Sequence, residues 1–211
     1  MKYTLIFSAI LIMTNGCGQN DASDNKEKSP NNTTETSAEK KNDGKPANRL
    51  FDVKAYKIVY NFSGGPETGT ETFYFDDYGE VAVLVVDKKM QYGATRQTII
   101  WKDKKSTIID HEKKSVSKSG FRPKSTEPPG IADISADARK GIGYEKMADE
   151  TVADKTCEVW FNAKLNIKYW LLNKVEIKLQ NQGVYTREAT SVEDISSIPA
   201  SLMEIPKDYK M

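Results

Sequence analysis

The stretch that decides the fold is Val175-Glu176-Ile177-Lys178-Leu179, which lies inside the longer segment 150–206. Apolar and charged residues alternate in it with a period of two, which is the pattern of a half-buried antiparallel strand. The alternation predicts an apolar face and a polar face, made respectively of Val175, Ile177 and Leu179 and of Glu176, Lys178 and Gln180. The segment therefore predicts a β-sheet with one dry and one wet surface.

Further strands are predicted on both sides of this one. Within the same segment they lie at residues 157–161, 167–172 and 185–192. Earlier in the chain, apolar runs between turn residues predict strands at 56–62, 70–75, 81–86, 94–101 and 106–110. The run 81–86 is apolar at every position, so both of its faces should be covered by other parts of the protein.

A different pattern interrupts the strands between residues 120 and 141. Pro123, Pro128 and Pro129 bar a central strand there, because proline lacks the N–H that a strand ladder needs. Residues 131–140 carry apolar side chains at helical spacing, and Gly141 is a natural helix stop. We therefore predict a mainly β fold, an antiparallel sheet of about nine to eleven strands rolled over a short helix or lid segment.

The N-terminal residues form two segments of another kind. Residues 1–16 combine Lys2 with an apolar run of signal-peptide length, which is too short to cross a membrane. Cys17 follows the small residue Gly16, and this arrangement resembles a bacterial lipoprotein signal, which implies cleavage before Cys17 and lipid attachment to it. The alternative is an ordinary secretory signal with an incidental Cys17. Residues 17–49 are polar and lack aromatic residues, which predicts a disordered tether before a folded domain at 50–211.

Charge and histidine content limit the kinds of function. Lys and Arg number 31 against 30 Asp and Glu, so the chain lacks the one-signed charge that nucleic-acid binding requires. The single histidine, His111, lies in a polar turn and is expected to be exposed. Metal cages and acid–base triads draw on several histidines, so neither a metal site nor another cofactor is predicted. Cys157 lies in a strand and is expected to be buried and inert, and no nucleophile–base pairing is visible, which predicts a non-enzymatic protein.

Large apolar side chains are spread over the predicted strands. Aromatic residues favour strands and fill cores, so these residues can be simple core. They can also line a cavity, because apolar ligands bind in the mouths of open barrels. The candidates for such a lining are Tyr60, Phe62, Phe73, Phe75, Trp101, Trp160, Tyr169, Val175, Ile177 and Leu179.

The order of signal, tether, first meander, proline-rich break and second meander resembles the outer-membrane lipoprotein sorting superfamily, and within it a branch without an assigned function. The resemblance is carried by residues 150–160, by Tyr169-Trp170-Leu171 and by the ending at 198–206. It implies an unclosed half-barrel whose concave face wraps an apolar cavity under helices and takes acyl chains. The soluble carrier of that system is not lipidated, whereas Cys17 indicates an anchored protein.

Two functions follow as expectations. The first is a lipid-anchored, non-enzymatic cell-envelope protein, at the outer membrane of a Gram-negative bacterium, that binds an acyl chain or a lipoprotein in a concave apolar cavity. The alternative is a structural or interaction module with a packed core that recruits an envelope protein or a glycan. An apolar void of several hundred Å³ favours the ligand, and a filled interior favours the module.

Overall fold

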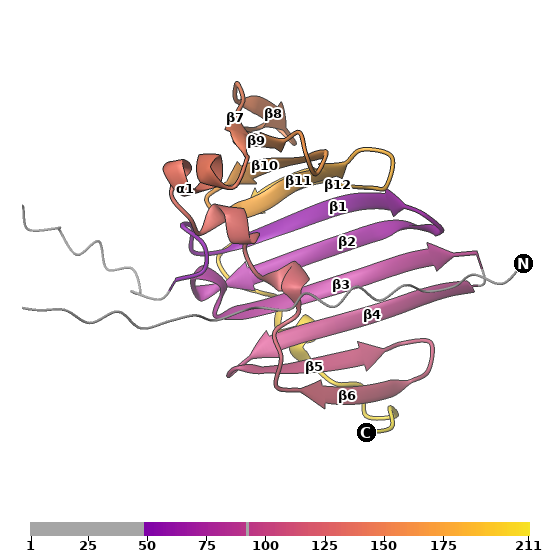
Figure 1. Cartoon of the computed structure of the whole chain (residues 1–211). Helices are drawn as coiled ribbons and strands as arrows, with labels where there is room; N and C mark the ends of the chain where they lie inside the picture. The colour runs from indigo at the N-terminus through magenta and orange to yellow at the C-terminus, as the bar shows by residue number, and fades with distance from the viewer. Residues whose placement is uncertain (1–48, 92) are drawn as a thin grey trace, which may run out of the picture. The chain divides into compact units, whose positions relative to one another are not determined.

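The computed structural model describes residues 49–91 and 93–211, which fold around one sheet of twelve strands (Figure 1). The predictions for residues 1–48, including Cys17, lie outside the described part of the chain. The strands are β1 (Tyr56–Gly64), β2 (Glu67–Asp76), β3 (Val81–Met90), β4 (Gly93–Lys102), β5 (Lys105–Asp110), β6 (Ser115–Ser119), β7 (Glu145–Lys146), β8 (Glu150–Val152), β9 (Lys155–Asn162), β10 (Ile167–Leu172), β11 (Val175–Asn181) and β12 (Tyr185–Asp194). Their order across the sheet is β6-β5-β4-β3-β2-β1-β12-β11-β10-β9-β7, and β8 pairs with β9.

All pairs of these strands are antiparallel, and the end strands β6 and β7 do not pair with each other within the described residues. The predicted mainly β, open antiparallel fold with a short helix is therefore confirmed. β1 to β6 form one meander and β9 to β12 another, and the pairing of β1 with β12 joins the two. The sequence pattern does not predict β6, which consists mostly of serine, or β7, which has two residues.

Three tight hairpins are formed by pairs of residues with positive φ, and the first is the connection of β4 to β5 by Asp103 and Lys104, with φ of 52° and 58°. Ala153 and Asp154 connect β8 to β9 with φ of 49° and 59°. Asn173 and Lys174 connect β10 to β11 with φ of 51° and 67°. Two successive residues of this kind match the right-handed twist of the flanking strands, so all three loops hold their strands in register.

Residues 120–144, which we call the lid, cross one face of the sheet between the end of β6 and the start of β7 (Figure 1). The lid contains the 3-10 turns η2 (Lys124–Thr126) and η3 (Gly130–Ala132) and the helix α1 (Ala136–Gly141). α1 is shorter than the helix expected at 131–140, because Ser135 caps its first turn by accepting a hydrogen bond from the Ala138 N–H. Ile131 lies instead in η3, where it is buried. Neither α1 nor any other helix of the described residues is long and apolar enough to span a membrane.

Residues 195–211, which we call the tail, cover the opposite face and contain the 3-10 turn η4 (Ala200–Met203). The tail packs on a cluster of buried strand residues, Val83, Ile100, Ile109 and Val116, through its own side chains Ile198, Leu202, Met203 and Tyr209. Leu84, the neighbour of Val83, belongs to the main core on the lid side. β3 is therefore covered on both faces, as its continuous apolar run predicts.

Candidate functional site

Strand pairing brings most of the predicted lining residues onto one face of the sheet, beneath the lid. Residues paired directly across neighbouring antiparallel strands point to the same side. Phe62 of β1 pairs with Arg187 of β12, and Arg187 pairs with Leu179 of β11. Leu179 pairs with Tyr169 of β10, which pairs with Trp160 of β9. The same rule places four further aromatic residues on this face: Tyr60, Phe73, Phe75 and Trp101.

The aromatic residues on the lid face pack against one another. The ring centroids of Phe51 and Phe75 are 4.3 Å apart, and those of Phe73 and Phe75 are 5.5 Å apart. Tyr60 and Phe75 are 1 % and 0 % exposed. Trp160 forms a separate cluster with residues of the lid and of β10. The predicted lining residues therefore form the core at the centre of the face, and at one end they pack against the lid.

A β-bulge alters the predicted faces of β11. Leu171 pairs with Glu176, but Trp170 pairs with Lys178, so Ile177 is an extra residue in the strand. Glu176 consequently shares the lid face with Leu171, and the prediction that it lies with Lys178 on a wet face is wrong. The two predicted lining residues that flank Glu176 are buried in the main core: Val175 and Ile177.

Glu176 belongs to a buried ionic network centred on Arg187. Arg187 Nε lies 2.6 Å from Glu71 Oε2, and Arg187 Nη1 lies 3.1 Å from Glu176 Oε1. The guanidinium carbon lies 3.5 Å from the centre of the Tyr60 ring. The Tyr60 hydroxyl donates to the backbone carbonyl of Glu176 at 2.7 Å. One cation and two carboxylates thus occupy the face on which an apolar ligand is expected.

Burial sets the protonation of this network. The side chain of Arg187 is 8 % exposed, and those of Glu71 and Glu176 are 13 % and 17 % exposed. Burial raises the pKa of the Glu176 carboxyl above its usual value, although the charge of Arg187 opposes this rise. Burial by itself would lower the pKa of Arg187, but the neighbouring acidic groups raise it above its usual value. Arg187 is therefore a permanent cation, and Glu176 holds its negative charge less firmly than an exposed glutamate does.

A small cavity lies between this network and the lid. Its volume is about 80 Å³, and its walls include Tyr60 and Arg187 from the sheet and Lys124 and Glu127 from the lid. Arg187 Nη2 is buried and has no hydrogen-bond partner among the described residues. Ligand pockets typically measure about 300–1,000 Å³, whereas one water molecule occupies about 30 Å³ of liquid. The cavity therefore has room for a few water molecules and not for an acyl chain.

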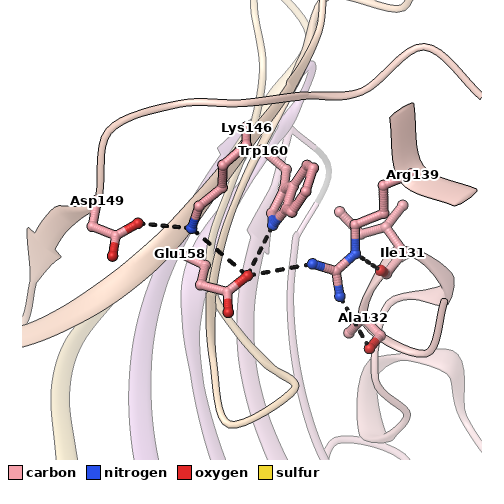
Figure 2. Close-up of polar contacts among 7 residues, drawn as sticks. All are labelled: Ile131, Ala132, Arg139, Lys146, Asp149, Glu158 and Trp160. Atoms are coloured by element: carbon pink, nitrogen blue, oxygen red, sulfur yellow. Dashed lines mark hydrogen bonds and ion pairs between the residues drawn. The ribbon is translucent and has the colours of Figure 1, made fainter. Parts of the chain in front are cut away.

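Arg139 holds one end of the lid against the sheet. Its guanidinium carbon lies 4.6 Å from the ring centre of Trp160, and it donates hydrogen bonds to the carbonyl oxygens of Ile131 and Ala132 (Figure 2). Arg139 Nη1 also lies 3.3 Å from Glu158 Oε2. The same carboxylate oxygen accepts a hydrogen bond from the Trp160 indole N–H at 3.1 Å (Figure 2). α1, η3 and β9 are consequently tied together at one point.

Arg122 holds the other end of the lid. Its guanidinium carbon lies 5.0 Å from the ring centre of Trp101. Arg122 Nη2 donates to the carbonyl oxygen of Thr126 at 2.9 Å and also donates to the carbonyl oxygen of Gly79. Cation–π contacts contribute about 0.5–2 kcal/mol each. Moving the lid off the sheet would therefore break stabilising contacts at both of its ends.

A second recess opens beside Arg139. It has a volume of about 280 Å³, and four charged side chains lie in its wall: Asp52, Arg139, Glu158 and Lys174. Because two of these groups are positive and two are negative, the recess has no charge preference for an anion or a cation.

His111 is not the exposed turn residue that the sequence predicts. It is half-buried between β4 and the tail. Its Nε2 lies 2.9 Å from the hydroxyl oxygen of Thr98, and its Nδ1 lies 3.1 Å from the hydroxyl oxygen of Tyr209. The prediction fails because Tyr209, which is distant in sequence, folds back over the turn after β5. Both ring nitrogens are engaged, so His111 fastens the tail.

Cys157 is 0 % exposed, which confirms the prediction of a packed strand residue. Burial raises the pKa of its thiol to about 11. Because the thiolate is the reactive form of cysteine, this residue is inert at neutral pH. No group of three or more His, Cys, Asp or Glu side chains in the described part of the chain could hold a metal ion.

The Arg187 network is the feature of the lid face that the sequence analysis misses. Arg187 stands between Thr186 and Glu188 in a strand, and such a residue is ordinarily assigned to the wet face. A weak signal was available, because Glu71 also occurs among β-branched and aromatic residues, at the second position of the strand predicted at 70–75. Only the strand order, which places β2, β1, β12 and β11 side by side, brings the three charged residues together.

Comparisons with known proteins give the following matches. No family model matches the chain, and no curated protein matches it. An uncharacterized conserved protein from Thermus thermophilus aligns with a TM-score of 0.49 and 7 % identity, over 74 % of this chain and 88 % of that one. MucB aligns with a TM-score of 0.43 and 11 % identity, over 76 % of this chain and 60 % of MucB. MucB in its complex with MucA(peri) aligns with a TM-score of 0.42 and 13 % identity, over 74 % of this chain and 55 % of that one. The chain thus spans somewhat more than half of MucB, and similarity at this level carries no inference about function.

Proposed function

We propose that this protein is a lipid-anchored, non-enzymatic module of the cell envelope whose packed sheet presents its outer surfaces to an envelope protein. The observation that carries the proposal is the filled lid face. Where an acyl chain would have to lie, the sheet holds packed aromatic rings and the Arg187–Glu71–Glu176 network. Of the two functions expected from the sequence, the interaction module is the one that this arrangement favours.

The energetic case against an acyl ligand comes from the charges on the lid face. Burying ten methylene groups contributes about 8 kcal/mol before the costs of association. A chain that entered beneath the lid would have to displace the contacts of Arg122 or Arg139 with aromatic rings. It would also lie against Arg187 and Glu176, which line the cavity of about 80 Å³. Removing water from a charged group without a new polar partner costs several kcal/mol, so these terms offset much of the gain.

The membrane anchor in this proposal rests on the sequence. Cys17 follows an apolar run of signal-peptide length, as in bacterial lipoproteins. In this proposal residues 17–49 serve as the tether that their composition predicts, with an expected reach of roughly 30 Å, which would hold the folded domain clear of the lipid headgroups. An open antiparallel sheet with a lid is also the fold that the resemblance to the lipoprotein sorting superfamily implies. Membership of that superfamily, and a place at the outer membrane, are parts of the proposal.

A binding role is favoured over catalysis by the state of the two residues best suited to react. The thiol of Cys157 has a raised pKa and is fully buried. His111 is held through both of its ring nitrogens by Thr98 and Tyr209. Neither side chain is placed to attack a substrate or to take up a proton from one.

Site-specific photo-crosslinking in living cells tests this function. A photoreactive phenylalanine analogue replaces one of three exposed apolar residues, Phe121, Leu165 or Val184, which are 84 %, 57 % and 62 % exposed. The same analogue replaces half-buried Tyr169 on the lid face as the comparison. The proposal predicts a discrete protein adduct from at least one exposed position and no lipid adduct from Tyr169. A lipid adduct that forms only at Tyr169 would show that the lid face holds an acyl ligand.

A further inference from the structure

The β6 end of the sheet carries a concentration of positive charge. The whole chain is nearly neutral, with a formal net charge of +1. Residues 102–124, which form the turn after β4, the strands β5 and β6 and the start of the lid, are strongly basic by contrast. They contain three acidic residues, Asp103, Asp110 and Glu112, against the basic residues Lys102, Lys104, Lys105, Lys113, Lys114, Lys118, Arg122 and Lys124. Such an asymmetry in a balanced chain points to a partner of opposite charge.

Three of these lysines converge on one groove of the tail face. Lys102 pairs with Lys105 across β4 and β5, and Lys118 of β6 pairs with Thr107 of β5. Since Thr107 follows Lys105 by two residues, all three lysines point to the same side of the sheet. With Asp103 and Thr107 they line a groove of about 420 Å³, in which three positive side chains face one negative one and Ile100, Met203 and Ile205 supply apolar wall. Within the described residues none of the three lysines takes part in an ion pair, so their charges are available to a partner.

The groove lies beside a strand edge that the tail covers only in part. β6 is the last strand at this end of the sheet. The tail covers the beginning of this edge, because the Val116 N–H donates to the carbonyl oxygen of Lys210 at 2.7 Å. Outward-facing backbone groups recur at every second residue of an edge strand, so those of Lys118 face outward as well. Phe121, just beyond the strand, is 84 % exposed. Unpaired backbone groups on an edge strand are a template for an added strand.

From these features we infer that the β6 edge binds an extended, acidic segment of a protein partner. The backbone of the segment pairs with β6, its carboxylates face Lys102, Lys105 and Lys118, and its apolar side chains enter the groove. The side-chain spacing of such a segment suits this face, because alternate side chains of an added strand point to the same side of the sheet, as the three lysines do. A peptide is favoured over an anionic membrane surface, because lipid headgroups offer no backbone to pair with the strand edge. The inference rests on the proposed function and names the chemistry of the partner.

Fluorescence anisotropy with a defined peptide tests the inference. The protein is the mature chain with Cys17→Ser, and the probe is a labelled short peptide of alternating glutamate and valine with blocked ends. Saturable binding that weakens as salt increases is expected, since exposed charges carry the recognition. Lys105→Glu combined with Lys118→Glu should weaken binding roughly tenfold or more, because two attractive contacts become repulsive. Lys164→Glu, an exposed lysine in the turn between β9 and β10, is the matched control and should leave binding unchanged.

Two further peptides separate the contributions of charge and backbone. A lysine–valine peptide should fail to bind, and so should the glutamate–valine peptide when it is N-methylated at alternate residues on the edge that faces β6. Equal binding of either one, or no binding of the original peptide to a folded protein, overturns the inference. Binding to phosphatidylglycerol vesicles in place of the peptide overturns it in favour of a membrane contact. If the glutamate–valine peptide does not bind but a protein adduct still forms at Leu165 or Val184 in the crosslinking experiment, this inference is refuted and the proposed function stands. A lipid adduct at Tyr169 refutes the proposed function.

Discussion

Replacing Arg187 with methionine tests the network at the centre of the lid face. The substitution keeps an apolar stem of similar length but leaves Glu71 and Glu176 without the cation that lies 2.6 and 3.1 Å from them. Removing one partner of a buried ion pair destabilises a protein by about 3–5 kcal/mol, because the remaining charge stays buried and unpaired. With a urea m-value of about 1–3 kcal/mol/M, the unfolding midpoint should fall by at least about 1 M. Equilibrium urea unfolding, followed by tryptophan fluorescence, measures this shift.

The pH dependence and a compensating variant sharpen this prediction. Burial already raises the pKa of Glu176, and loss of the Arg187 charge removes the interaction that opposes the rise. The folded variant then binds more protons than its unfolded chain, so its stability falls as pH rises from about 4.3, the usual pKa of glutamate, through the folded value. The deficit relative to the wild type should therefore be smaller at pH 5 than at pH 8. Adding Glu71→Gln and Glu176→Gln should restore much of the stability, and a loss below about 1 kcal/mol in the single variant would refute the buried network.

Three further outcomes follow from the structure and the sequence. Cys17→Ser should abolish metabolic labelling with a fatty-acid analogue and release the protein from the membrane fraction, whereas equal labelling would rule out lipidation at this residue. Cys157 should react slowly with a bulky thiol reagent, as expected of a thiol with a pKa of about 11, and Cys157→Ala should cost about 1 kcal/mol or somewhat more; rapid modification would contradict its burial. Arg139→Ala should increase protease cleavage within the lid, because α1 loses its contacts with Trp160 and Glu158. Lys164→Ala, at an exposed position, is the control. Equal cleavage of both variants would mean that Arg139 does not hold the lid.

Local patterns were enough to predict the antiparallel strands, because alternation and turn residues act over short distances, whereas the open form of the sheet was predicted from the family resemblance. They could not predict the faces of β11, since the bulge at Ile177 depends on how β10 pairs with it. They could not reveal the ionic network either, because Glu71 and Arg187 lie on β2 and β12. These strands are far apart in sequence but are separated only by β1 in the sheet. His111 was misplaced because Tyr209, far away in sequence, supplies its partner. The sequence identifies the aromatic residues on the lid face, but only the three-dimensional packing shows whether they contact other side chains or line a cavity.

Isothermal titration of the mature chain carrying Cys17→Ser with a long-chain fatty acid tests the central claim most directly. The claim is that the lid face does not hold an acyl chain, because the cavity beside Arg187 measures about 80 Å³ and the recess beside Arg139, of about 280 Å³, is walled by charged side chains. It predicts no saturable heat at concentrations at which a buried chain would bind with micromolar affinity. Saturable one-to-one binding to the folded protein would contradict it, and would mean that the lid opens to admit an acyl chain.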